Sequence, residues 1–160
     1  MHTTVKIQLY AIAAWSLVIF SLIMANVANP DSFFYPLKRI QEKTFFSLKT
    51  TPDSQVNYLN NLLDIRLREL KNLISNGAYS YLWSSSLRYS TTAGQMTDLV
   101  VANNLKDMVG PVKNKFLNHK KILDEMYVVY PKNTNNVEWK YLLDGINYLN
   151  SYLDQLSQIK

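Results

Sequence analysis

The feature that most constrains this chain is an uncharged, mostly apolar run from Ile7 to Ala25, in which Gln8, Ser16 and Ser21 are the polar side chains. As a helix, the run would extend over about 28 Å, close to the thickness of a hydrocarbon core. In a soluble protein, a helix that is apolar on every face needs a large surrounding core, which a chain of 160 residues does not easily supply. The run therefore predicts a transmembrane helix.

Three parts follow from this prediction: a cytoplasmic tail over residues 1–6, a membrane-spanning signal anchor over 7–28, and an extracytoplasmic domain over 29–160. Contact with the membrane is assigned to residues 7–25. A short charged tail normally stays inside the cell, whereas a long domain is translocated largely regardless of its charge. We therefore expect a single-pass protein of the cell membrane with its N-terminus in the cytoplasm.

A cleavable signal peptide is the alternative interpretation of the same run. Cleavage sites carry small residues three before and one before the cut. A cut after Ala25 would put Ile23, and a cut after Ala28 would put Asn26, where a small residue is needed. The run is also longer than the apolar core of a signal peptide, about 7–15 residues. Both observations favour an uncleaved anchor, whereas cleavage would make this a secreted protein.

Composition narrows the fold and the chemistry of the chain. Cysteine is absent, which excludes disulfides, thiolate zinc sites, a cysteine nucleophile and a lipoprotein anchor. Four glycines and five prolines supply few turns, which disfavours β-sandwiches and barrels. The net charge of +5 is mild, so we expect no specific binding of nucleic acid.

Beyond Pro30, apolar residues recur with helical spacing, and no stretch is convincing as a strand. With the anchor, this pattern predicts an all-α protein: an N-terminal transmembrane helix followed by an antiparallel helical bundle or helical hairpins. The expected helices begin near Pro36; at Pro52 behind the N-cap Thr51, ending at Asn76-Gly77; at Ala78, ending at Val109; at Pro111, ending at Tyr130; and at Trp139 after a polar turn over 132–136. Gly94 weakens the middle of the third of these helices, and the sequence leaves open whether that helix is continuous, kinked or broken there.

The last expected helix carries a heptad seam from Trp139 to Leu156. An intramolecular core explains the seam without further assumptions. The alternative is a coiled coil with a second copy of the chain, which would make the protein a homo-oligomer.

One segment is more specific than periodicity. Residues 30–39 read Pro-Asp-Ser-Phe-Phe-Tyr-Pro-Leu-Lys-Arg, with Glu42 following, and resemble the opening of a bacterial family of unknown function. Its members carry this stretch just after a signal or membrane segment, and an R-L-x-E-L-like element in the next helix, matched here by residues 66–70. The resemblance implies an exported helical domain, sometimes attached to anti-sigma-factor-like membrane proteins, with no established enzymatic activity.

The charges of this motif have a structural and a functional interpretation. Lys38 or Arg39 can pair with Glu42 within one helical turn, and Arg66 can pair with Glu69. Such pairs would lock a helical hairpin together, whereas the alternative is a surface for a ligand or partner. The matched residues are Tyr35, Pro36, Leu37, Lys38, Arg39, Glu42, Arg66 and Glu69.

Few patterns in the chain suggest catalysis or metal binding. His119 has no second ligand at helical spacing, so we expect it on a solvated helix face. Phosphate-binding loops, nucleophile elbows and zinc-protease motifs are absent. The sequence therefore predicts no enzyme, no cofactor and no metal site.

A basic cluster and many aromatic residues supply the remaining candidates for binding. Lys113, Lys115, Lys120 and Lys121 lie close together in sequence with no acid between them. They are interpreted either as a solvated helix face or as contacts for anionic lipid or an anionic envelope polymer. Eleven tyrosines and three tryptophans suit half-buried helix contacts or an aromatic docking platform.

We therefore expect a bacterial cell-envelope protein: a membrane-anchored, extracytoplasmic helical scaffold or binding protein whose protein partner the sequence does not identify. The alternative is a module that binds an envelope polymer or senses a ligand through the basic helix at 113–121 and exposed aromatic residues.

Overall fold

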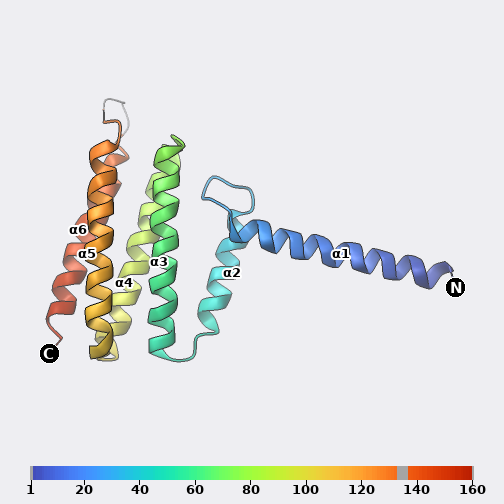
Figure 1. Cartoon of the computed structure of the whole chain (residues 1–160), viewed down its shortest axis with the longest axis horizontal. Helices are drawn as coiled ribbons and strands as arrows, with labels where there is room; N and C mark the ends of the chain where they lie inside the picture. The colour runs from blue at the N-terminus through green and yellow to red at the C-terminus, as the bar shows by residue number, and fades with distance from the viewer. Residues whose placement is uncertain (1, 133–136, 160) are drawn as a thin grey trace. The chain divides into compact units, whose positions relative to one another are not determined.

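The computed structural model describes residues 2–132 and 137–159 and divides the chain into two compact units, Met1–Phe45 and Phe46–Lys160. Within the described residues every regular element is a helix and no strand occurs, which confirms the all-α prediction. The N-terminal unit contains a long first helix and most of the second, and the C-terminal unit contains the other helices (Figure 1). The polar turn expected at 132–136 lies, from residue 133 onward, outside the described residues.

The N-terminal unit is built from α1 (His2–Asn26) and α2 (Tyr35–Ser47). The cytoplasmic tail was expected over residues 1–6. Because α1 begins at His2, residues 2–6 of that segment belong to this helix. Among the residues whose side chains are described, no helix combines the length and the apolar character needed to cross a membrane. The transmembrane helix expected over 7–28 is therefore not supported by that finding.

The C-terminal unit consists of two helical hairpins. The first joins α3 (Pro52–Ser75) to α4 (Leu82–Ala102) through the short 3-10 helix η1 (Tyr79–Tyr81), and the second joins α5 (Lys106–Val129) to α6 (Trp139–Ser157). Each hairpin is antiparallel, but α4 and α6, which pack against each other between the hairpins, run in the same direction (Figure 1). The predicted hairpins are thus present, with parallel neighbours where they meet.

The ends of α3 follow directly from its sequence. Thr51 accepts a hydrogen bond from the backbone N–H of Ser54, and the Ser54 hydroxyl oxygen accepts one from the N–H of Thr51, which together form a capping box in front of Pro52. At the other end Gly77 takes the left-handed conformation (φ 69°), and Ala78 N–H donates to the carbonyl of Leu73. This Schellman motif confirms the predicted end at Asn76-Gly77.

Two predicted helix boundaries are wrong. The helix expected from Ala78 to Val109 is not broken near Gly94; it ends instead at Ala102. There Asn104 takes the left-handed conformation (φ 50°) and Leu105 N–H donates to the carbonyl of Val100, so an asparagine closes α4 as Gly77 closes α3.

The second wrong boundary is Gly110-Pro111, which was expected to separate two helices. The next helix, α5, starts at Lys106 and passes through both residues. Proline lacks one backbone donor, so at this place it removes one hydrogen bond near the start of the helix. The turn at Asn103 to Leu105, rather than the proline, sets the boundary.

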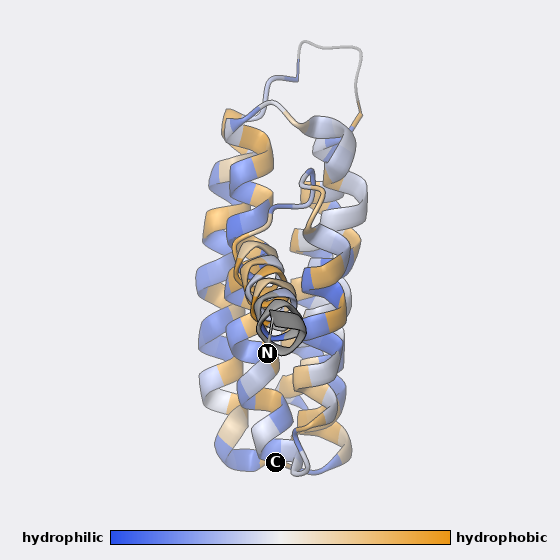
Figure 2. Cartoon of the chain, turned by 90° about the vertical axis from the view of Figure 1, so that its right-hand side faces the viewer, coloured by the Kyte–Doolittle hydropathy of each residue, from blue (hydrophilic) through white to orange (hydrophobic). Residues whose placement is uncertain are grey.

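The core of the C-terminal unit lies between the two hairpins. Hydrophilic and hydrophobic segments alternate along the bundle helices, as expected for helices with one buried face (Figure 2). The heptad seam of α6 faces this core: Leu142, Leu149 and Leu156 are fully buried, and Trp139 and Leu153 pack at its margin. The seam is therefore covered by helices of the same chain.

Candidate functional site

The sequence motif at residues 35–42 holds the N-terminal unit together. Tyr35 and Lys38 are both buried, and the Lys38 ammonium donates a hydrogen bond of 2.9 Å to the carbonyl of Ala28. This bond ties the segment after α1 to the first turn of α2. Pro36 is the second residue of α2, where its fixed φ suits the helix and its missing N–H leaves no bond unmade.

The ion pairs expected within the motif are present. Glu42 pairs with Arg39 at 2.9 Å, and Lys38 donates to the Ala28 carbonyl. In the bundle, Arg66 and Glu69 form a pair at 2.8 Å on one face of α3, with almost no exposed side-chain surface. Removing either partner would leave a buried charge uncompensated, so the bundle requires both residues together.

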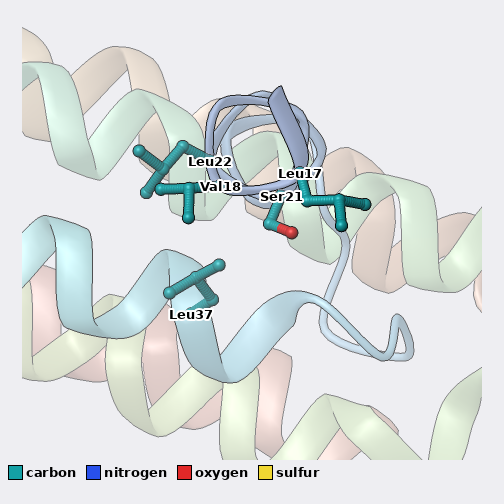
Figure 3. A pocket seen from close by; sticks show the side chains of 5 residues that line it. All are labelled: Leu17, Val18, Ser21, Leu22 and Leu37. Atoms are coloured by element: carbon teal, nitrogen blue, oxygen red, sulfur yellow. The ribbon is translucent and has the colours of Figure 1, made fainter. Parts of the chain in front are cut away.

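An open hollow of about 310 Å³ lies where α2 crosses α1. Leu17, Val18, Ser21 and Leu22 of α1 line one side, and Leu37 of α2 lines the other (Figure 3). The amide of Gln41 donates to the Leu22 carbonyl at 3.2 Å and fixes the crossing point. Four of the five lining side chains are aliphatic, so the hollow suits a hydrocarbon group rather than a polar ligand.

A polar network passes through the bundle from α3 to α5 to α4. The Lys115 ammonium donates to both carboxylate oxygens of Asp64, at 2.8 and 2.7 Å. His119 Nε2 lies 2.8 Å from the same carboxylate, and His119 Nδ1 lies 3.2 Å from the hydroxyl of Tyr89. Since a carboxylate only accepts, Nε2 carries the proton, and Nδ1 accepts a hydrogen bond from the Tyr89 hydroxyl.

Burial sets the protonation states in this network. It lowers the pKa of His119 below its ordinary 6.5, although Asp64 acts in the opposite direction. Burial alone would raise the pKa of Asp64, but hydrogen bonds from Lys115 and His119 bring it below its usual value. Burial also raises the pKa of Tyr89. At neutral pH the network therefore holds a neutral histidine between a carboxylate and an un-ionised phenol.

The network corrects the expectation that His119 is solvated. This residue is 4% exposed and contacts α3 and α4 through its two ring nitrogens. Its partners are 55 and 30 residues away in sequence, so periodicity within one helix did not indicate them. The spacing of Lys115 and His119 by four residues was the available signal, because it places both on one face of α5, toward a single carboxylate.

Asp64, His119 and Tyr89 follow the order carboxylate, histidine, hydroxyl, which is also the order of groups in a catalytic triad. The resemblance ends there. Tyr89, which occupies the position of the terminal hydroxyl, is completely buried, so a substrate has no access to it. The solvent-accessible end is the Asp64–Lys115 pair. Within the described part of the chain, no group of three or more histidine and acidic side chains is placed to hold a metal ion.

The four lysines predicted as contacts for an anionic partner are in different situations. Lys115 is held by Asp64, and Lys113 donates to the Ser157 hydroxyl at 2.9 Å. Lys121 is exposed and Lys120 is partly exposed. The structure therefore does not bring the four ammonium groups together on one open face.

A shallow groove of about 130 Å³ lies between α4 and α6. Trp83 and Leu87 line it from α4, and Tyr148 and Tyr141 line it from α6, with Asp144 as its only ionisable side chain apart from the tyrosines. Trp83 is 58% exposed and Tyr148 is 51% exposed. This is the place in the bundle where exposed aromatic side chains from two helices meet.

Comparison with known proteins gives one match. A family model described as "Domain of unknown function (DUF5667)" matches residues 27–133. This agrees with the expected resemblance to a helical family of unknown function. No curated protein and no solved structure matches the chain.

Proposed function

The chain belongs to the DUF5667 family, a family defined by a domain of unknown function, and from this premise we propose that it is a membrane-anchored binding protein. In this proposal α1 anchors the chain in the cell membrane of a bacterium, and the helical bundle is held outside the cytoplasm. The bundle acts by binding a partner and not by catalysis.

The observation that carries the proposal is the exposure of apolar side chains around α1. Trp15 is 68% exposed and Phe20 is 56% exposed, and they lie on different sides of the helix. Among the side chains of α1 that the structure describes, the other exposed large apolar residues are Tyr10, Ile12, Leu17, Val18, Ile19, Leu22 and Ile23. A surface that is apolar all round a helix is unfavourable in water and is favoured in a lipid environment.

The groove between α4 and α6 is the proposed binding surface. Exposed aromatic side chains contribute strongly to protein interfaces, since each buries a large area with little loss of conformational entropy. Asp144 is the only carboxylate in the lining, and the lining contains no basic side chain. We infer that the partner is a protein segment that presents a basic side chain to Trp83, Tyr148 and Asp144.

The absence of catalysis is proposed from the buried network. Its histidine and tyrosine satisfy each other and Asp64 inside the bundle. A fully satisfied buried network fixes the register of the helices that it joins. The role proposed for Asp64, His119 and Tyr89 is therefore to hold α3, α4 and α5 in one arrangement.

Anchoring is tested with an alkaline-phosphatase fusion at the C-terminus and with alkaline extraction of membranes. We expect the fusion to be active and the full chain to stay in the membrane pellet, because α1 supplies the apolar surface that lipid covers. A matched chain that lacks residues 2–26 but carries a separate cleavable signal should be exported and extracted. An inactive fusion, or a full chain released by alkali, would overturn the proposal.

The groove is tested in the same cells with a photo-cross-linking amino acid in place of Trp83. We expect a protein adduct that is lost when Asp144→Asn is added. The same probe at Leu117, an exposed residue of α5, is the control. Equal adducts at both positions, or adducts insensitive to Asp144→Asn, would contradict a specific groove.

A further inference from the structure

The two helices of the N-terminal unit cross steeply. Figure 1 shows α1 running away from the start of α2 in a different direction, and Figure 3 shows α1 nearly end-on while α2 runs across the view. The crossing is fixed by two hydrogen bonds from one face of α2, Gln41 to the Leu22 carbonyl and Lys38 to the Ala28 carbonyl. If α1 follows the membrane normal, α2 therefore lies close to the plane of the membrane.

The crossing lies at the level of apolar residues of α1. Gln41 and Leu37 of α2 lie beside Leu17 and Leu22, within the uncharged run of the chain. With α1 in a bilayer, these contacts place α2 at the boundary between headgroups and acyl chains, where amphipathic helices lie.

The side chains of α2 suit that depth. Ile40 is 61% exposed, and Leu37 lines the hollow next to α1. Lys43 is exposed three residues after Ile40, where its long stem can follow apolar surface and carry the ammonium to the headgroups.

We propose that the elbow, formed by residues 17–22 of α1 and residues 37–43 of α2, is a phospholipid-binding site. A lipid acyl chain fills the hollow between Leu17, Leu22 and Leu37, and the lipid phosphate lies near Lys43. The inference rests on the proposed anchoring by α1. It goes beyond that proposal because anchoring by α1 alone would not require α2 to contact lipid.

An acyl chain is the occupant favoured by the lining. The hollow presents aliphatic side chains and a single hydroxyl, from Ser21. The hollow is open, and Leu17, Val18 and Leu22 in its lining also belong to the exposed apolar residues of α1. The hollow is thus continuous with the surface that the anchor presents to the bilayer, so the same lipid can cover both.

The site is tested by measuring the depth of single labels in vesicles of equal parts phosphatidylcholine and phosphatidylglycerol. The chain contains no cysteine, so one introduced cysteine carries a fluorescent label at a unique place. The variants are Ile40→Cys in α2, Ile12→Cys in α1, and Asn61→Cys, an exposed residue of α3, as the control. Lipids with a nitroxide at a shallow or deep position act as quenchers.

We expect shallow nitroxides to quench the Ile40→Cys label severalfold more than the Asn61→Cys label, and deep nitroxides to quench the Ile12→Cys label most. A label at Ile40→Cys that behaves like the one at Asn61→Cys, with the Ile12→Cys label still in lipid, overturns the lipid site and leaves the anchor intact. Both labels in water would overturn the anchor as well.

Discussion

Single residues of the bundle are arranged so that one polar network joins three helices. His119 donates to Asp64 of α3 and accepts from Tyr89 of α4, and Lys115 completes the charge balance at the solvent end. Protonation of His119 would turn Nδ1 into a donor and leave the buried Tyr89 hydroxyl proton without an acceptor. The network is therefore stable with a neutral histidine.

The first prediction concerns the dependence of stability on pH. The pKa of His119 is lower in the folded chain than its ordinary 6.5, so as the pH falls below that value the unfolded state takes up a proton first. Its stabilising contribution is complete above about pH 6.5 and is lost on acidification, with a slope of at most about 1.4 kcal/mol per pH unit. Urea unfolding at pH 7.5 and pH 5 measures this loss.

Two substitutions isolate the histidine. The chain has two histidines, so His119→Gln removes the one in the bundle and His2→Gln serves as the control. The free energy of unfolding should depend on pH less in the His119→Gln chain than in the native chain, and equally in the His2→Gln chain. The lowered pKa of Asp64 adds a further loss only below its ordinary 3.8, outside this range. An unchanged pH dependence in His119→Gln would refute the assignment.

At the scale of elements, the sites where helices pack closely decide which substitutions are tolerated. α4 and α6 approach each other at Gly94, where an added Cβ would lie 2.8 Å from the hydroxyl oxygen of Tyr152. The Tyr152 ring lies stacked on Tyr148 and tilted against Phe116. Its hydroxyl also donates to the Ser90 carbonyl at 3.3 Å. These contacts restrict how far the ring can shift.

We predict that Gly94→Ala destabilises the bundle while Gly110→Ala stabilises it. Both glycines lie inside helices, where alanine is favoured by up to about 1 kcal/mol. A Cβ at Gly110 meets no atom within 4 Å, so only the propensity acts there. At Gly94 the forced shift of Tyr152 costs about 1–3 kcal/mol and outweighs it.

Thermal unfolding of the two alanine variants measures the difference. Adding Tyr152→Phe to Gly94→Ala should recover part of the loss, because it removes the atom in closest contact. Equal effects of the two alanines would show that α4 and α6 are packed less closely at Gly94 than the structure indicates.

Helix boundaries show what the sequence could predict at this scale. The start and end of α3 were predictable because Thr51, Pro52 and Gly77 each supply a local backbone preference. The end of α4 was missed because Asn104, which also tolerates the left-handed conformation, is a weaker signal than glycine. Pro111 predicts a helix boundary that the structure does not have. The hydrogen bond that the proline removes from α5 is outweighed by the burial of Val112 and Phe116 after it.

At the scale of the whole molecule, the family match and the structural units have different boundaries. The match covers residues 27–133, whereas the bundle unit runs from Phe46 to Lys160 and includes α6. Leu142, Leu149 and Leu156 of α6 are fully buried in the bundle core. A fragment cut at the end of the match would expose the faces of α4 and α5 that α6 covers.

We therefore predict that a fragment of residues 46–160 folds by itself and that a fragment of residues 27–133 does not. Loss of three fully buried leucines removes several kcal/mol of hydrophobic stabilisation, at about 1.5–3 kcal/mol each, from a domain of ordinary marginal stability. Circular dichroism and thermal unfolding distinguish the two. Cooperative unfolding of the 27–133 fragment, or a non-cooperative 46–160 fragment, would contradict this division.

The fold was more predictable than the candidate sites, for a physical reason. Helical periodicity is local, so the apolar faces of α3 and α6 were visible in the sequence. The network of Asp64, His119 and Tyr89, and the groove between α4 and α6, both depend on which helices become neighbours. The ion pairs Arg39–Glu42 and Arg66–Glu69 were predictable although they belong to candidate sites, because the two partners of each pair are three residues apart in one helix.

The order of helices in the bundle affects when its core can form during synthesis. Because α6 packs against both α4 and α5, the helix that follows the other bundle helices along the chain is the one that completes the core. During synthesis the α3–α4 hairpin can form early from neighbouring segments, but the apolar face of α5 has to wait for residues 139–157. Until α6 emerges, the nascent chain exposes this face to chaperones and proteases, so the lifetime of the incomplete bundle depends on how soon α6 follows α5.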